Sequence, residues 1–161
     1  MLSLNDLSFH ISMMEEALLL AHQAFRLGEV PIGAVIVNNN KIIASAYNTK
    51  ELHNNCLAHA EIKSLYEAQN KLGKWRLSDC YLYSTLEPCF MCAAALVHAR
   101  IAGVIFAAPD AKFGGIISIY NMANDQRLNH NFDYISGIKE YESTKLLKKF
   151  FNQIRKVKKK L

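Results

Sequence analysis

The stretch CYLYSTLEPCFMCAAALVHARIAGVIFAA, residues 80–108, decides the fold of this chain. Its first part, Cys80–Ser84, predicts a strand, Pro88–Ala99 predicts a helix, and Ile101–Ala107 predicts a buried strand. Pro88 suits the first turn of the helix, where its missing N–H is not needed. Strands that alternate with helices indicate a layered α/β domain, although the order of the strands in the sheet does not follow from this pattern.

The same alternation continues on both sides of this stretch. Further helices are expected over Ser8–Leu27, His59–Leu72 and Lys139–Lys159, and further strands over Gly33–Asn38, Lys41–Tyr47 and Phe132–Ser136. We expect Ser8 to cap the first helix, Gly28 to end it, Asn38-Asn39-Asn40 to turn a hairpin, and Gly73 to end the second helix. A polar loop is expected over Asn48–Leu57, and a short helix within the irregular segment Phe113–Asn131.

The composition indicates one globular domain over residues 1–161. Hydrophobic residues make up 51% of the chain and charged residues 20%, which suffices for one sizeable core. The start, Met1–His10, has no Lys or Arg, so a secretory signal is not expected. The most apolar stretch, Ile101–Ala108, is too short to span a bilayer. We therefore expect a cytoplasmic protein with no membrane partner.

Four cysteines occur in the chain, at positions 56, 80, 89 and 92. Two disulfides are one alternative, but an intracellular protein more often uses a close Cys pair for metal binding or redox chemistry. We expect Cys56 and Cys80 to be free thiols, with Cys80 packed in the core.

A metal-binding pattern unites His59-Ala60-Glu61 with Cys89 and Cys92. Cys89 and Cys92 are three residues apart, so both sulfurs can face one ion from the start of a helix, where thiolates are favoured. His59 can supply a third ligand. Three protein ligands leave one tetrahedral position for water, which is typical of catalytic zinc. Glu61 is then placed to move protons between that water and a substrate.

Each part of this pattern has a simpler alternative. The Cys pair alone fits a redox motif or two small buried residues, and His59 alone fits a histidine satisfied by ordinary hydrogen bonds. Their joint occurrence, with each part opening a predicted helix, favours one Zn²⁺ per chain.

The positive charge of the chain is concentrated at its end. Residues 145–160 contain eight of the 19 Lys and Arg residues and none of the 14 Asp and Glu residues. Such a segment attracts polyanions, because neutralising phosphates releases counterions. A solvated helix rich in Lys is the alternative.

The His-x-Glu and Pro-Cys-x-x-Cys pair resembles the signature of the cytidine-deaminase-like zinc deaminases. Several further segments resemble the bacterial tRNA adenosine deaminases: residues 29–35 (EVPIGAV), 58–62 (AHAEI), 85–89 (TLEPC), 91–93 (MCA), 110–112 (DAK) and 128–130 (LNH), and Phe150-Phe151 before the basic end. The resemblance covers nearly the whole chain. Pro109 is a departure, because some relatives carry a basic residue there.

The resemblance implies a three-layer α/β/α fold with a central five-stranded mixed sheet, and a homodimer that converts adenosine to inosine at the wobble position of a tRNA anticodon. It implies that His59, Cys89 and Cys92 hold zinc and that Glu61 is catalytic. The implied substrate-binding residues are Pro31, Ile32, Asn48, Ala60, Leu86, Glu87, Asp110, Lys112 and Phe150. Of these, Pro31, Ile32 and Asn48 would line the base pocket, and Asp110, Lys112 and Phe150 would lie near the flanking nucleotides of the anticodon stem-loop.

Simpler roles compete at these positions. Pro31 could only shape a turn, Asn48 cap a loop, Asp110 and Lys112 form a surface pair, and Phe150 pack a helix on the core. Two other functions also compete: deamination of a free base or nucleoside of the guanine or cytidine type, and a silent zinc-stabilised RNA-binding subunit. The basic end of the chain and the motifs of the adenosine type argue against the first, and Glu61 argues against the second.

Overall fold

The computed structural model describes residues 6–158. Its helices are α1 (Leu7–Arg26), α2 (Ala60–Leu72), α3 (Phe90–His98) and α4 (Glu140–Lys158), and its strands are β1 (Gly33–Asn38), β2 (Lys41–Tyr47), β3 (Cys80–Leu86), β4 (Gly103–Ala108) and β5 (Asp133–Ser136). The strands form one sheet in the order β2-β1-β3-β4-β5. Strand β1 runs antiparallel to β2 and β3, whereas β3, β4 and β5 are parallel.

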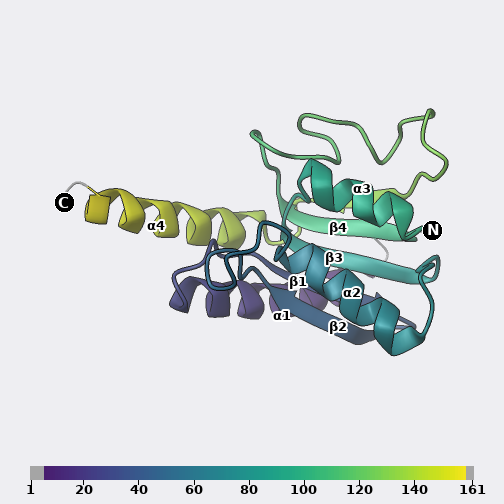
Figure 1. Ribbon diagram of the computed structural model, residues 1–161, viewed down its shortest axis with the longest axis horizontal. Coiled ribbons are helices and arrows are strands. Elements are labelled where there is room, and N and C mark those ends of the chain that lie inside the picture. Colours follow the sequence, from purple (N-terminus) through teal and green to yellow (C-terminus); the bar gives the residue numbers. More distant parts are fainter. Residues whose placement is uncertain (1–5, 159–161) are drawn as a thin grey trace.

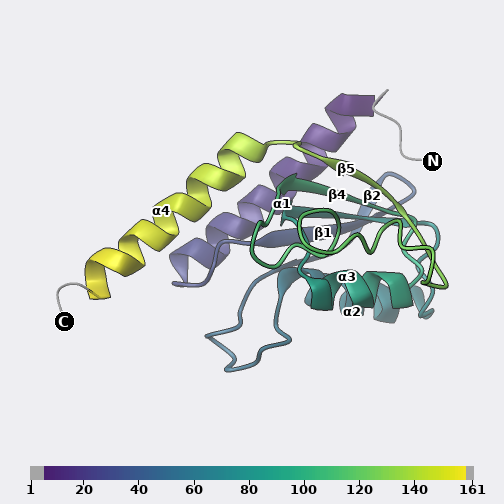
Figure 2. The same cartoon turned by 90° about the horizontal axis from the view of Figure 1, so that it is seen from above.

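Helices cover both faces of this sheet (Figures 1 and 2). Helices α1 and α4 lie on one face, and α2 and α3 lie on the other. The predicted α/β/α fold with a five-stranded mixed sheet is therefore confirmed.

Helix α1 packs closely on β1. Its buried residues, which include Met14, Ala17 and Ala21, recur at the spacing of one helix face. Gly33, at the start of β1, allows the close approach, because a Cβ atom there would lie 2.1 Å from the backbone oxygen of Ala17. The hairpin between β1 and β2 turns at Asn39 and Asn40, whose φ angles of 47° and 58° suit a tight two-residue turn.

The stretch that decides the fold forms the parallel crossover from β3 through α3 to β4. Leu82, Leu96, Val104 and Phe106 from these three elements are fully or almost fully buried in one apolar cluster. The crossover places the start of α3 just beyond the carboxyl end of β3, the edge of an α/β sheet where ligands commonly bind.

Three details differ from the sequence-based expectations. Asp6, rather than Ser8, caps α1, and its carboxylate accepts a hydrogen bond from the backbone N–H of Phe9. Pro88 lies before α3 rather than in its first turn, because Cys89 occupies the N-cap position with an extended backbone. The expected short helix within Phe113–Asn131 is wrong: this described segment contains turns and one isolated bridge, from Gly114 to Cys89.

Helix α4 continues past the sheet edge (Figure 2). Its first half is anchored by the buried side chains of Ser143, Leu146 and Phe150, whereas the side chains of residues 151–157 are exposed. The predicted last residue of this helix, Lys159, lies outside the described residues. Within residues 6–158, no helix combines the length and the apolar character needed to cross a membrane.

Candidate active site

Two helix N-termini meet at the predicted metal ligands. His59 is the N-cap residue of α2 and Cys89 is the N-cap residue of α3, and neither side chain caps its own helix. Cys92 follows in the first turn of α3 and is buried. Because the side chains of both N-cap residues are free of capping bonds, they can face one another between the helices.

The three ligand side chains form a compact group. His59 Nδ1 lies 3.7 Å from Cys89 Sγ and 3.5 Å from Cys92 Sγ, and the two sulfurs lie 3.5 Å apart. Among the described residues, this is the single cluster of His, Cys, Asp or Glu side chains suited to hold a metal ion. The sequence-based grouping of His59 with two cysteines distant in the chain is therefore reproduced in space.

Glu61 is almost completely buried in the first turn of α2. Its Oε2 atom has no hydrogen-bond partner among the described residues, although an unpaired buried carboxylate oxygen is costly. Burial raises the pKa of this carboxyl group to about 7. A carboxyl group with a pKa near neutrality can both accept and donate a proton.

The two thiols titrate differently because one hydrogen bond links them. The hydrogen bond between the two sulfurs, which lie 3.5 Å apart, lowers the pKa of Cys89 to about 4. The same hydrogen bond, together with burial and the nearby negative charge of Glu61, raises the pKa of Cys92. A coordinated metal ion would displace the shared proton, since a thiol ligand binds as the thiolate.

These residues fit zinc. One nitrogen and two sulfur donors, with ligand atoms all within 4.8 Å of one another, match the soft and borderline ligands that Zn²⁺ prefers. Three protein ligands leave a position open for a further ligand, and the unpartnered Oε2 of Glu61 provides a nearby acceptor. Cys56 and Cys80 take no part in the cluster; both are free, and Cys80 is fully buried, as predicted.

Glu87 ties the loop after β4 to the start of α3. Its buried carboxylate accepts backbone hydrogen bonds from Asp110, Ile116, Ile117 and Ser118, as well as a bond from the Ser118 hydroxyl. These bonds lower the pKa of Glu87 against the opposing effect of burial. In this structure Glu87 therefore organises the loop that passes beside Cys89.

The other predicted substrate residues fall into two groups. Pro31, Asn48 and Ala60 are buried and Ile32 and Leu86 half-buried, and the Asn48 backbone N–H donates to the Ile32 oxygen over 3.0 Å. Asp110 shapes its own turn, because its Oδ1 accepts from the backbone N–H groups of Lys112 and Phe113, and the Lys112 side chain is exposed.

Phe150 is not brought to this site. Its ring is 4% exposed and packs edge-on against Phe25 of α1, with ring centroids 6.0 Å apart. This burial favours the alternative role of packing α4 on the core, since no open ring face remains for a base. The neighbouring Phe151 is 44% exposed.

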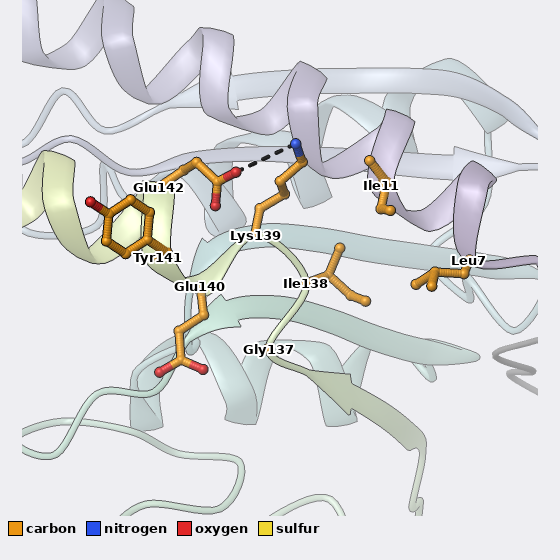
Figure 3. A pocket seen from close by; sticks show the side chains of 8 residues that line it. All are labelled: Leu7, Ile11, Gly137, Ile138, Lys139, Glu140, Tyr141 and Glu142. Atoms are coloured by element: carbon orange, nitrogen blue, oxygen red, sulfur yellow. Dashed lines mark ion pairs between the residues drawn. The ribbon is translucent and has the colours of Figure 1, made fainter.

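A surface hollow occurs on the opposite face, between the start of α1 and the turn into α4 (Figure 3). Its lining residues are Leu7, Ile11, Gly137, Ile138, Lys139, Glu140, Tyr141 and Glu142. Lys139 Nζ lies 3.5 Å from Glu142 Oε1 of α4, the ion pair dashed in Figure 3. It also lies 2.8 Å from Glu15 Oε1 of α1, so its charge links α1 to α4. With no His or Cys in its lining, this hollow offers none of the ligand chemistry of the His59 cluster.

Comparisons with known proteins agree with this geometry. Residues 9–155 match the family model described as MafB19-like deaminase. The chain is 45% identical over 146 residues to a protein of Bacillus subtilis (strain 168) named tRNA-specific adenosine deaminase, with 91% of each chain covered. This chain belongs to the tRNA-specific adenosine deaminase family. The family assignment explains why the ligand motifs occur in this order on this sheet.

Solved structures place the fold in the same group. A structure from studies of A-to-I editing by tRNA:A34 deaminases is 41% identical, with a TM-score of 0.82, and the match covers 84% of this chain and 99% of that chain. A guanine deaminase from Nitrosomonas europaea has a TM-score of 0.76 at 22% identity, over 87% of this chain and 83% of that one. The second likeness concerns the fold alone, because deaminases of different bases share it.

Two charged residues near the site were not predicted from the sequence. Glu29 is 1% exposed and accepts hydrogen bonds from Asn48 and Leu52, and the half-buried Lys63 donates to the Tyr47 oxygen and the Thr49 hydroxyl. The sequence places Glu29 between a helix and a strand and Lys63 on a helix, where charged residues are usually solvated. No local sequence pattern predicts that Glu29 and Lys63 are buried or half-buried.

The site predicts that zinc depends on both thiols. The purified protein should contain about one zinc per chain, and Cys89→Ala or Cys92→Ala should remove most of it, because each takes away one of three ligands. Metal analysis after gel filtration measures this, with Cys56→Ala as the matched control that keeps its zinc. Full zinc occupancy in both ligand variants would contradict the ligand assignment.

Proposed function

We propose that this chain hydrolyses adenosine to inosine at the wobble position of a tRNA anticodon, releasing ammonia. The observation that carries the proposal is the buried Glu61 carboxyl, with Oε2 unpartnered, beside a three-ligand metal cluster. A structural zinc site has no use for such a group. The relatives named tRNA-specific adenosine deaminase support the substrate.

The chemistry divides between a metal and Glu61. His59, Cys89 and Cys92 would hold zinc, which would supply activated water by lowering the pKa of that water to about 7. Glu61 accepts the water proton at its carboxylate and delivers it to the ring nitrogen N1 of adenine as hydroxide adds to C6. Glu61 then takes the proton of the new C6 hydroxyl and passes it to the amino group as the C6–N bond breaks, so that adenosine and water become inosine and ammonia.

The substrate pocket requires the base to leave its stack. Extrusion from a single-stranded anticodon loop costs less than extrusion from a duplex, which favours this substrate. Pro31, Ile32 and Asn48, which lie together at the edge of β1 and the start of the loop 48–58, would hold the base. We further propose that the protein works in the cytoplasm, where its tRNA substrate is present.

Glu61→Gln tests this division of roles. The variant should keep its zinc and its melting temperature but lose activity by about 100- to 10,000-fold, the usual contribution of a general acid–base group. Inosine formation in an anticodon stem-loop with adenine at the wobble position measures the effect, and Glu67→Gln on the exposed face of α2 is the control. Near wild-type turnover would exclude Glu61 as the proton carrier. Loss of zinc would make it a structural residue.

We also propose that α4 contacts RNA phosphates. Lys148, Arg155 and Lys156 are exposed on this helix, and the segment from Ser143 onward has no acidic residue. The projection of α4 beyond the sheet leaves these charges accessible from several sides (Figure 1). The exposed ring of Phe151 offers a stacking surface on the same segment.

Removal of the α4 charges should weaken RNA binding. Replacing Lys148, Arg155 and Lys156 together by Gln keeps length and helix propensity but removes three charges. Affinity for the stem-loop should fall, and the slope of log K against log[salt] should flatten by about 0.7 for each phosphate that is no longer neutralised. The control is the triple change of Lys41, Lys71 and Arg76 to Gln, which removes equal charge elsewhere on the surface. An equal effect of both triple variants would show that only overall charge matters.

A homodimer is the third part of the proposal. Phe90, Phe113, Ile119 and Tyr120 form an exposed apolar group next to Cys89, here named the Phe90 patch. The rings of Phe90 and Tyr120 lie with centroids 5.7 Å apart, and the backbone N–H of Phe90 donates to the Phe113 oxygen, so these three residues are neighbours. Patches of this kind mark interaction surfaces, and a second copy of the chain would cover both patches symmetrically.

The double change of Ile119 and Tyr120 to Glu should convert a dimer into a monomer, because it places charge in the Phe90 patch. Light scattering coupled to gel filtration reports the mass. Leu19→Glu, at an equally exposed apolar position on α1, should leave the dimer intact. A wild-type protein that is monomeric at high micromolar concentration would overturn this part of the proposal without affecting the reaction.

A further inference from the structure

Glu29 is a buried carboxylate without a partner of opposite charge in direct contact among the described residues. It is 1% exposed, and Oε2 accepts a hydrogen bond from Asn48 Nδ2 over 3.0 Å. Its other oxygen, Oε1, accepts from the backbone N–H of Leu52 over 2.6 Å. Both oxygens are therefore committed to the loop that begins at Asn48.

The hydrogen bond to Glu29 fixes the orientation of the Asn48 side-chain amide. Oε2 of Glu29 accepts this hydrogen bond from Asn48 Nδ2, so the NH₂ group of Asn48 faces Glu29. The amide oxygen Oδ1 then faces away and makes no hydrogen bond with the described residues. Asn48 is left with one free N–H and one free carbonyl oxygen in a fixed order.

Asn48 begins the loop that leads to the metal ligand His59. Its backbone N–H donates to the Ile32 oxygen, and the next residue, Thr49, donates to the Ala58 oxygen over 3.0 Å. Ala58 directly precedes the ligand His59. The loop 49–58 is thus closed at its base, with Asn48 on one side and the metal ligand on the other.

Lys63 braces the same segment from α2. Its ammonium donates to the Tyr47 oxygen over 3.1 Å and to the Thr49 hydroxyl over 3.0 Å. The charge of Glu29 partly offsets the lowering of the Lys63 pKa by burial. Two charged residues from different elements therefore hold the backbone on either side of Asn48, which gives its amide little freedom to turn.

We propose that Glu29 is a positioning residue that sets base selectivity through Asn48. This inference rests on the proposed deamination of a nucleobase at the His59 cluster. By holding the NH₂ group, Glu29 makes Asn48 present one donor beside one acceptor to the base.

The hydrogen-bonding groups on the edges of adenine and guanine determine which base the Asn48 amide can pair with. The major-groove edge of adenine carries an acceptor, N7, beside a donor, the 6-amino group, and an asparagine amide pairs with both. Guanine carries two acceptors on the same edge, N7 and O6. An amide fixed with one donor and one acceptor matches adenine and leaves its oxygen facing O6 of guanine. Glu29 therefore favours adenine without touching it.

Glu29→Gln tests the proposal. Glutamine keeps the size of the side chain and the bond to Leu52, but its own NH₂ group can donate to Asn48 Oδ1 and so release the amide to turn. We expect zinc content to be unchanged and kcat/KM on the wobble-adenine stem-loop to fall about ten- to hundredfold, the range for one bidentate base contact. The guanine-bearing stem-loop serves as a competitive inhibitor, which gives its affinity. The ratio of the affinity for the adenine-bearing stem-loop to that for the guanine-bearing one should fall by a similar factor.

A double variant shows whether Glu29 orients the Asn48 amide or only stabilises the fold. In Glu29→Gln with Asn48→Asp, the glutamine NH₂ donates to the aspartate, so the hydrogen bond is retained and the melting temperature should match that of the single variant. Activity should stay low, because aspartate presents no donor to the base. Glu67→Gln serves as the control for removal of one carboxylate.

The outcomes are distinct. Unchanged adenine preference in Glu29→Gln, or recovery of activity in the double variant, would overturn the inference and leave Glu29 a structural residue. If the double variant does not fold, the base preference of the single variant decides. A wild-type protein that forms no inosine would instead refute the proposed function, and this inference with it.

Discussion

The structure depends on the meeting of two helix N-termini at one metal-ligand cluster. His59 begins α2 and Cys89 begins α3, and their ligand atoms lie 3.7 Å apart. The parallel crossover from β3 to β4 fixes the start of α3, and the antiparallel hairpin β1-β2 delivers the chain to the start of α2. Exposed N–H groups and the dipoles of both helices favour negative charge there, so the fold supplies an environment suited to thiolates.

Two buried carboxylates hold the irregular segments that surround this cluster. Glu29 binds the loop before α2, and Glu87 binds the loop after β4 through four backbone N–H groups. Neither loop has regular secondary structure to accept the hydrogen bonds of its backbone N–H groups. The carboxylate oxygens accept them in place of the carbonyl oxygens of a strand or helix. A third carboxylate, that of Glu61, is buried with an oxygen free. Of these three carboxylates, only Glu61 has an oxygen atom, Oε2, that is free to accept a proton or a hydrogen bond from a substrate.

The long helix α4 combines two roles along its length. Its first half is anchored by Ser143, Leu146 and Phe150, and its second half is exposed and basic. Adjacent phenylalanines therefore have opposite environments: Phe150 packs on α1 and Phe151 faces outward. The sequence motif that suggested one RNA contact contains a core residue and an exposed one.

The sequence by itself determined the elements, because apolar periodicity, asparagine turns and glycine stops are local signals. It also indicated the candidate metal ligands His59, Cys89 and Cys92, with Glu61 as their acid–base partner, since this set of residues has few other joint uses. Only the tertiary structure decided the burial of Glu29 and Phe150, and the conformation of the loop Phe113–Asn131, whose backbone bonds go to Glu87 and to residues beside Cys89. These features depend on partners distant in sequence, and a charged residue shows its burial only when the groups that satisfy it have been brought together by the fold.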